Sequence, residues 1–185
     1  MIRRPVFLTL LLTLSTVVPF AVSAKPKPGD SSEVKTHGVF SADKAKRGSV
    51  VQAAVIIDIP NGYHVNSNRP LSKFAIPTDL KVTAPRGVRS GAVAFPRSTV
   101  KTFSFSQEKL SVFENRAVLR FSVTVPADFK GDSIELHGRL RFQSCTDEVC
   151  FPPDSRDIRM RISVVDATES TKNINGGIFG GRRGH

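Results

Sequence analysis

The chain holds two cysteines, which lie close together in the stretch Phe142-Gln-Ser-Cys145-Thr-Asp-Glu-Val-Cys150-Phe-Pro-Pro153. Two thiols this close in sequence can form a disulfide, which either stabilises a fold or exchanges with the thiols of another protein. Exchange begins when an external thiolate attacks one sulfur and forms a mixed disulfide. Because the residues between the cysteines are polar, we expect this loop at the surface, where a partner thiolate could reach either sulfur.

A structural disulfide is the general alternative, since exported domains commonly contain stable bridges. Closing so short a loop stabilises a fold by roughly 2 kcal/mol in the chain-entropy model, against about 3 kcal/mol for a fifteen-residue loop. A domain of this length can also build a hydrophobic core without a bridge. Both observations favour exchange, but a non-catalytic binding module with a structural disulfide stays open as the alternative.

Two carboxylates, Asp147 and Glu148, lie between the cysteines. Negative charge beside a thiol disfavours the thiolate and is expected to raise the pKa of the thiol. This argues against a nucleophile that is active by itself. It predicts a reduced pair that reacts when a docked partner changes its surroundings. Solvated loop carboxylates without a role are the simpler interpretation of the same residues.

Other chemistries find little support in the sequence. Two cysteines without a second close pair of ligands do not make a zinc site, so we expect no metal and no cofactor. The formal net charge is +11, but the basic residues are spread along the chain, and with no Trp and one Tyr we expect no nucleic-acid partner. The four histidines are scattered: His37, His64, His137 and His185.

The amino terminus has the three parts of a secretory signal peptide. Arg3 and Arg4 precede an apolar stretch, residues 5–20, and the small residues Val22-Ser-Ala24 suit cleavage after residue 24. This predicts export to an oxidising compartment, and we expect the periplasm. No later apolar run approaches the roughly 20 residues of a membrane-spanning helix, so we expect no membrane span after cleavage.

The rest of the chain divides into a polar linker (25–33), one β-domain (34–166) and a disordered tail rich in Gly and Asn (167–185). Within the domain, apolar and polar residues alternate in short segments separated by turn signals, which predicts strands. No segment shows a convincing helical period, which indicates an all-β sandwich, with a barrel as the alternative. The clearest alternations cover residues 51–59, 117–125, 134–142 and 158–164.

Two of these segments, 134–142 and 158–164, flank the cysteine loop and are expected to pair as its stem. Residues 99–109 have neither helical spacing nor clear strand bounds, and predict a loop that carries Phe103 and Phe105.

A hairpin is expected further along the domain. Residues 110–113 lead into the turn Glu114-Asn115-Arg116, and the alternating segment 117–125 follows directly. Adjacent strands joined by a short turn commonly pair with each other.

The chain resembles the N-terminal periplasmic domain of the thiol:disulfide interchange protein DsbD. The resemblance covers roughly Val34 to Val165 and rests on motifs in the same order as in that family. They are Asn61-Gly-Tyr-His-Val-Asn66, Ile76-Pro-Thr78, Phe95-Pro96, Leu110-Ser-Val-Phe113-Glu-Asn115, and Cys145-x4-Cys150 followed by Phe-Pro-Pro.

The resemblance implies an immunoglobulin-like sandwich with a redox pair, Cys145 and Cys150, at one end. The second cysteine of the family pair forms the mixed disulfide, which implies that role for Cys150. A cap loop with an aromatic tip shields the family disulfide, and Phe103 or Phe105 resembles that tip, with a slight preference for Phe105. Tyr63 resembles an aromatic residue near the site.

The resemblance also implies partners. The family domain receives electrons from a thioredoxin-like domain, fed by a membrane-embedded domain, and passes them to periplasmic thiol proteins. This sequence shows neither of those two domains, so we expect its partners to be separate thioredoxin-like or other periplasmic thiol proteins and a separate membrane electron transporter. The sequence also departs from some family members, which have one more residue between the cysteines and acidic residues in the cap, where this chain has Thr102 and Ser104.

Overall fold

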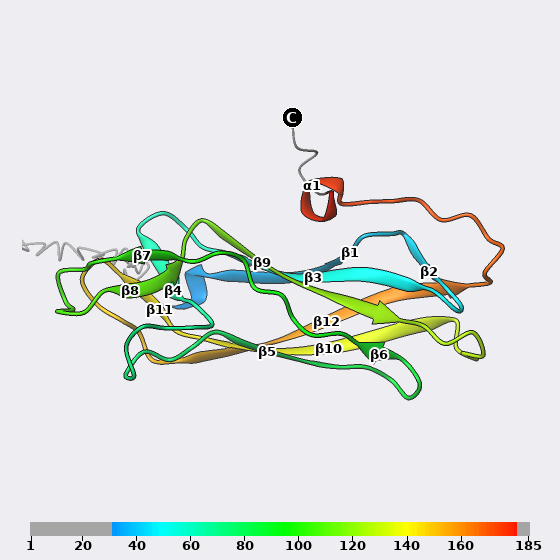
Figure 1. The fold of residues 1–185 in the computed structure, drawn as a ribbon, viewed down its shortest axis with the longest axis horizontal. Coiled ribbons are helices and arrows are strands. Elements are labelled where there is room, and N and C mark those ends of the chain that lie inside the picture. Colours follow the sequence, from blue (N-terminus) through cyan, green and yellow to red (C-terminus); the bar gives the residue numbers. More distant parts are fainter. Residues whose placement is uncertain (1–30, 181–185) are drawn as a thin grey trace, which may run out of the picture.

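A computed structural model describes residues 31–180, and nearly all of their regular secondary structure is β-strand (Figure 1). The strands form three four-stranded sheets. The first has the order β1 (Lys35–Phe40), β3 (Val50–Asp58), β9 (Arg116–Thr124) and β6 (Arg89–Ser90). The second has the order β2 (Lys44–Lys46), β12 (Asp154–Val165), β10 (Ser133–Phe142) and β5 (Asp79–Thr83).

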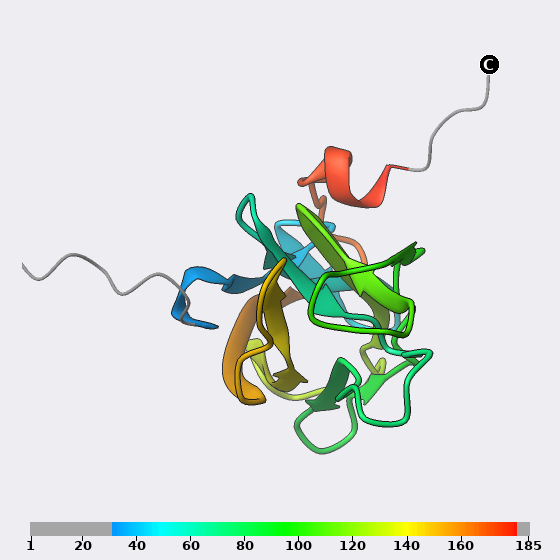
Figure 2. The same ribbon diagram turned by 90° about the vertical axis from the view of Figure 1, so that its left-hand side faces the viewer.

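The third sheet is smaller and lies at one end of the molecule, on the left of Figure 1. Figure 2 looks onto that end. The sheet has the order β11 (Ser144–Thr146), β4 (Tyr63–Asn66), β8 (Leu110–Phe113) and β7 (Thr99–Lys101), and we call it the site sheet. Two single-turn helices complete the structure, a 3-10 helix at Ser31–Glu33 and α1 at Gly176–Phe179.

The first two sheets pack face to face around the main hydrophobic core. Their strands alternate buried and exposed residues, as in β9 and β10, because each sheet has one face on the core and one on solvent. The two layers approach closely at Gly38 of β1, where an added Cβ would stand 2.3 Å from the Met160 Cγ of β12. The predicted all-β sandwich is therefore confirmed.

The predicted stem of the cysteine loop is also confirmed. Strands β10 and β12 pair antiparallel from Ser133 opposite Ser163 to Phe142 opposite Asp154. Strand β10 then continues almost directly into β11, which carries the first cysteine. The longest ladder of the second sheet thus fixes where the cysteine loop begins and ends.

The hairpin expected between residues 110–113 and 117–125 is not formed. Strand β8 pairs with β4 and β7 in the site sheet, whereas β9 pairs with β3 and β6 in the first sheet. The chain changes sheets at Asn115, which has a φ of 58° and whose carbonyl accepts a hydrogen bond from the Ile59 N–H at 2.8 Å. The turn was therefore predicted correctly, but the pairing partners were not.

The structure describes part of the segment expected to be a disordered tail, as far as Gly180, and places it against the first sheet. The Asn175 side-chain amide donates to the Phe40 carbonyl at 2.9 Å. The Arg120 guanidinium donates from Nε and Nη2 to the Ile178 carbonyl, at 3.0 and 2.7 Å. Hydrogen bonds to backbone groups hold this segment beside the first sheet.

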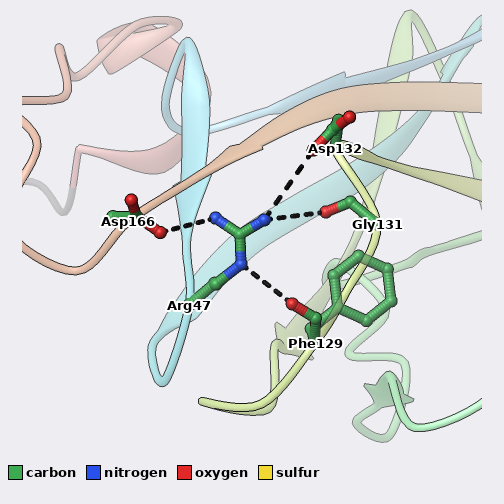
Figure 3. Close-up of polar contacts among 5 residues, drawn as sticks. All are labelled: Arg47, Phe129, Gly131, Asp132 and Asp166. Atoms are coloured by element: carbon green, nitrogen blue, oxygen red, sulfur yellow. Dashed lines mark hydrogen bonds and ion pairs between the residues drawn. The ribbon is translucent and has the colours of Figure 1, made fainter.

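The other end of the sandwich is closed by Arg47, which follows β2 (Figure 3). Its Nε donates to the Phe129 carbonyl at 2.8 Å and its Nη2 to the Gly131 carbonyl at 3.2 Å. Its Nη1 pairs with Asp166 at 2.8 Å, and Nη2 lies 3.9 Å from Asp132. One side chain thus joins the β2–β3 turn, the loop before β10 and the end of β12.

The predicted signal peptide lies outside the described residues, as does most of the predicted linker. Within residues 31–180, the structure has no helix long and apolar enough to cross a membrane.

Candidate functional site

The site sheet has two different faces. On one face, Val65 and Phe113 belong to the main hydrophobic core. The opposite face carries a separate buried cluster of Phe103, Leu110 and Val112. Because neighbouring residues along a strand point to opposite faces, His64 shares the second face with Val112 and not with the core residue Val65.

Cys145 and Cys150 form a disulfide with an S–S distance of 2.01 Å and a Cα–Cα distance of 3.9 Å. Cys145 lies within β11 and is 0% exposed, whereas Cys150 is partly exposed. The loop that joins them folds back on itself, because the Thr146 N–H donates to the Val149 carbonyl at 2.8 Å. The expectation that a partner could reach either sulfur is therefore wrong for Cys145, which is shielded by its position in the strand.

His64 of β4 lies directly opposite Cys145 of β11 in the strand register. Its side chain is 1% exposed, and its ring stacks on Phe103 with centroids 3.9 Å apart and an interplanar angle of 16°. Burial lowers the pKa of His64, while Asp147 and Glu114 act to raise it. Nothing in the spacing of the histidines along the chain singles out His64, because its position depends on a strand pairing between distant segments.

A loop between β7 and β8, residues 102–109, covers this face of the site sheet, and we call it the cap loop. Phe103 is 8% exposed, and Phe105 is 36% exposed. Their rings lie 5.5 Å apart at 17°. The cap loop contacts the cysteine loop directly, since the Ser104 hydroxyl donates to the Asp147 carbonyl at 2.8 Å. The structure therefore brings both predicted cap residues to the cysteine end, with Phe103 beneath and Phe105 at the rim.

A groove of about 340 Å³ opens beside the disulfide. Cys150 and Phe105 both line it, together with Leu110 and the exposed Phe74. Cys145 is not among its lining residues. The groove therefore gives access to one cysteine of the pair from a surface with aromatic walls.

Gln143, between β10 and β11, holds the far side of the cysteine loop. Its Nε2 donates to the Phe151 carbonyl at 3.0 Å, and its Oε1 accepts from the Asn66 side chain at 3.0 Å and from the Ile76 N–H at 3.3 Å. One amide thus ties the residue after Cys150 to β4 and to a neighbouring loop. The sequence pattern shows that this position is polar, but it does not show which three segments the side chain joins.

The remaining predicted site residues lie nearby, but in different settings. Tyr63 packs against Phe151, with ring centroids 6.1 Å apart and tilted by 32°, next to the main core. Asp147 and Glu148 are exposed in the cysteine loop. No group of three or more potential metal-binding side chains occurs within residues 31–180.

The protein is thus a β-sandwich domain with a disulfide at one end. One cysteine of the disulfide is buried, and the other lines a groove. The chain matches the family model described as "Thiol:disulfide interchange protein DsbD, N-terminal" over residues 34–162. This chain therefore belongs to the family of DsbD N-terminal domains. Its fold is the β-sandwich expected from the resemblance, and the family together with the paired cysteines supports a thiol–disulfide exchange module.

The solved structures that are similar to this chain include two N-terminal domains. The N-terminal periplasmic domain of ScsB from Proteus mirabilis has a TM-score of 0.50 and 12% identity, over 75% of this chain and 51% of that one, so this chain spans about half of that domain. The reduced N-terminal domain of DsbD from Neisseria meningitidis has a TM-score of 0.42 and 17% identity, over 71% of this chain and 90% of that one. Comparison with curated protein sequences gives no match.

Proposed function

We propose that this chain is an exported thiol–disulfide exchange module that passes reducing equivalents to partner proteins through Cys145 and Cys150. Its partners are thioredoxin-like or other thiol proteins of the periplasm, and a separate membrane electron transporter supplies the electrons. Family membership supports this class of activity. The solved structure of the periplasmic ScsB domain is consistent with that compartment.

The observation that carries the proposal is the difference between the two sulfurs. A disulfide can exchange only through a sulfur that an external thiolate can reach along the line of the S–S bond. Cys150 lines the groove, and Cys145 is fully buried. Cys150 is therefore the residue that forms the mixed disulfide, and Cys145 is the residue that resolves it.

The reaction proceeds in two steps. The Cys150 thiolate attacks one sulfur of the partner disulfide, which forms a bond between Cys150 and the partner and releases the other partner sulfur as a thiolate. Cys145 then attacks Cys150, the Cys145–Cys150 bond forms, and the second partner sulfur leaves. The partner gains two electrons, and the domain loses two.

The cap loop controls which thiols reach Cys150. Phe105 lies at the rim of the groove and Phe103 is packed beneath it. A partner that docks against these aromatic walls displaces or accommodates Phe105, whereas a small thiol has no comparable contact area with which to do so. Shielding of this kind protects a reduced pair from nonspecific oxidation.

The test uses two matched single-cysteine variants. Cys145→Ser keeps the accessible sulfur but removes the resolving one, so it should accumulate a stable mixed disulfide with an oxidised thioredoxin-like protein, visible by non-reducing electrophoresis and mass spectrometry. Cys150→Ser keeps the buried sulfur and should accumulate none. Equal trapping by both variants would contradict the assignment of roles, and trapping by neither would contradict exchange.

A further inference from the structure

A row of three side chains crosses the edge of the site sheet. Cys150 pairs with Cys145 through an isolated antiparallel bridge, and Cys145 pairs with His64 in the β11–β4 register. Residues directly opposite each other on antiparallel strands point to the same face, with Cβ atoms about 4.5–5.5 Å apart. The imidazole of His64 therefore lies on the same face as the buried sulfur, as its neighbour on the side away from Cys150.

The Nε2 atom of His64 is buried and has no hydrogen-bond partner among the described residues. Stacking on Phe103 occupies the face of the ring and leaves the nitrogen edge free. Most buried polar atoms in folded proteins are hydrogen-bonded, so an unpartnered one calls for an explanation. In a neutral ring with its proton on Nδ1, Nε2 is a proton acceptor, and in the disulfide form it makes no hydrogen bond to either cysteine sulfur.

The proposed exchange needs such an acceptor at Cys145. Burial disfavours the charged form of a thiol, so Cys145 does not become a thiolate easily at 0% exposure. Bulk water does not reach this sulfur to take its proton. The attack of Cys145 on Cys150 therefore requires a base within the protein.

We propose that His64 accepts the thiol proton of Cys145 as Cys145 resolves the mixed disulfide. This inference rests on the proposed function. The proton moves from the Cys145 sulfur to Nε2, the Cys145–Cys150 bond forms, and the bond between Cys150 and the partner breaks. The partner sulfur leaves with the bonding electron pair, and the imidazolium then gives its proton to solvent or to the released thiolate.

The charges around His64 suit a base that is neutral before the reaction and becomes protonated only while Cys145 resolves the mixed disulfide. Burial keeps the ring neutral by lowering its pKa, and a neutral ring is the form that accepts a proton. Asp147 from the cysteine loop and Glu114 from the end of β8 both favour the imidazolium, and Lys101 of β7 opposes it. Lys101 is itself ion-paired with Glu114, so the opposite effects of these two residues on the pKa of His64 partly cancel.

The two steps can be measured separately with one small aromatic disulfide, dithiobis(nitrobenzoate), mixed in equal amount with the fully reduced domain. Attack by Cys150 releases the first coloured thiolate, and resolution by Cys145 releases the second. His64→Phe keeps an aromatic ring on Phe103 but removes the nitrogen. We expect it to leave the first phase unchanged and to slow the second by about tenfold or more near neutral pH.

The pH dependence of the second phase shows whether His64 acts as a base or only supports the structure. Above the pKa of the Cys145 thiol no base is needed, so the second phases of wild type and His64→Phe should converge as the pH rises. His64→Gln, a smaller polar variant, should show the same profile if His64→Phe folds poorly. His137→Gln is the matched control, because His137 is exposed on β10, and it should behave as wild type.

Equal slowing of both phases, or an unchanged second phase in both His64 variants, would overturn the role of His64 while leaving the exchange function intact. A wild-type domain that releases neither thiolate, together with a Cys145→Ser variant that traps no oxidised thioredoxin-like protein, would overturn the exchange function and the inference together.

Discussion

At the residue scale, the two cysteines differ because they occupy different kinds of backbone. Cys145 is paired within β11, and Cys150 follows a loop and faces the groove. The same strand pairing that buries Cys145 also places His64 beside it. The division of roles that we propose for the two sulfurs therefore follows from strand register and not from the chemistry of the thiols themselves.

Phe105 should limit the access of small thiols to Cys150. We expect Phe105→Ala to increase the rate at which dithiothreitol or glutathione reduces the disulfide, because Phe105 lines the groove and is 36% exposed. Its free energy of unfolding should change by less than about 1 kcal/mol, as is usual for surface positions. Stopped-flow reduction and denaturant unfolding measure the two quantities.

Phe103→Ala is the companion variant, and it should destabilise the domain by about 3 kcal/mol, because Phe103 is buried against His64. An unchanged rate of reduction in Phe105→Ala would contradict the assignment of Phe105 to the rim of the cap.

Acidification should destabilise the oxidised domain through His64. Its pKa is lower in the folded protein than in the unfolded chain, so the unfolded chain takes up the proton first as the pH falls. The stabilising effect of a neutral His64 is therefore complete well above about pH 6.5, the ordinary histidine value, and declines as the pH falls from there to the lowered folded pKa.

Urea unfolding of wild type and His64→Phe at a series of pH values measures this contribution. The loss of stability with falling pH should be smaller in the variant. An identical pH dependence in both proteins would show that His64 does not titrate with unfolding.

At the element scale, the site depends on short strands that join distant parts of the chain. The alternation in residues 134–142 and 158–164 predicts the stem correctly, because a long amphipathic strand carries its own signal. The site sheet could not be predicted in the same way, since β4, β8 and β11 are each three or four residues long. Such strands are defined by their partners, and the sequence does not show which partners they choose.

The same limit explains why the hairpin expected at Asn115 is not formed. Turn residues at Asn115 indicate a change of direction, but they do not show that the chain passes to another sheet. The segment after β12 lacks apolar residues, and it is held by Asn175 and Arg120 through bonds to backbone carbonyls. In the site, the cysteine pair and the cap aromatics are visible in the sequence, whereas the roles proposed for His64 and Gln143 follow from the fold.

The end of the sandwich away from the cysteines should affect stability without affecting exchange. Arg47→Met removes two hydrogen bonds to backbone carbonyls from a partly buried guanidinium, and we expect it to lower the free energy of unfolding by about 1–3 kcal/mol. Asp166→Asn removes one exposed ion pair and should cost less than about 1 kcal/mol.

Denaturant unfolding measures the stability of both variants, and the rate of reduction by dithiothreitol measures exchange. A changed rate of reduction in Arg47→Met would show that the two ends of the sandwich are coupled.

At the scale of the whole molecule, a sandwich presents one accessible cysteine, Cys150, at one end. The main core and the Arg47 contacts hold the two large sheets together. The site sheet, the cap loop and the groove surround the disulfide at the opposite end (Figures 1 and 2). A domain of this kind needs no large movement for exchange beyond displacement of the cap by a docked partner.

The reduction potential of the Cys145–Cys150 disulfide tests the exchange function most directly. It can be measured by equilibrating the purified domain with dithiothreitol or glutathione buffers and quantifying the oxidised fraction. We expect a value above about −300 mV, in the range of proteins that exchange disulfides. A value below about −300 mV would identify an inert structural bridge and would contradict a role for this cysteine pair in thiol–disulfide exchange.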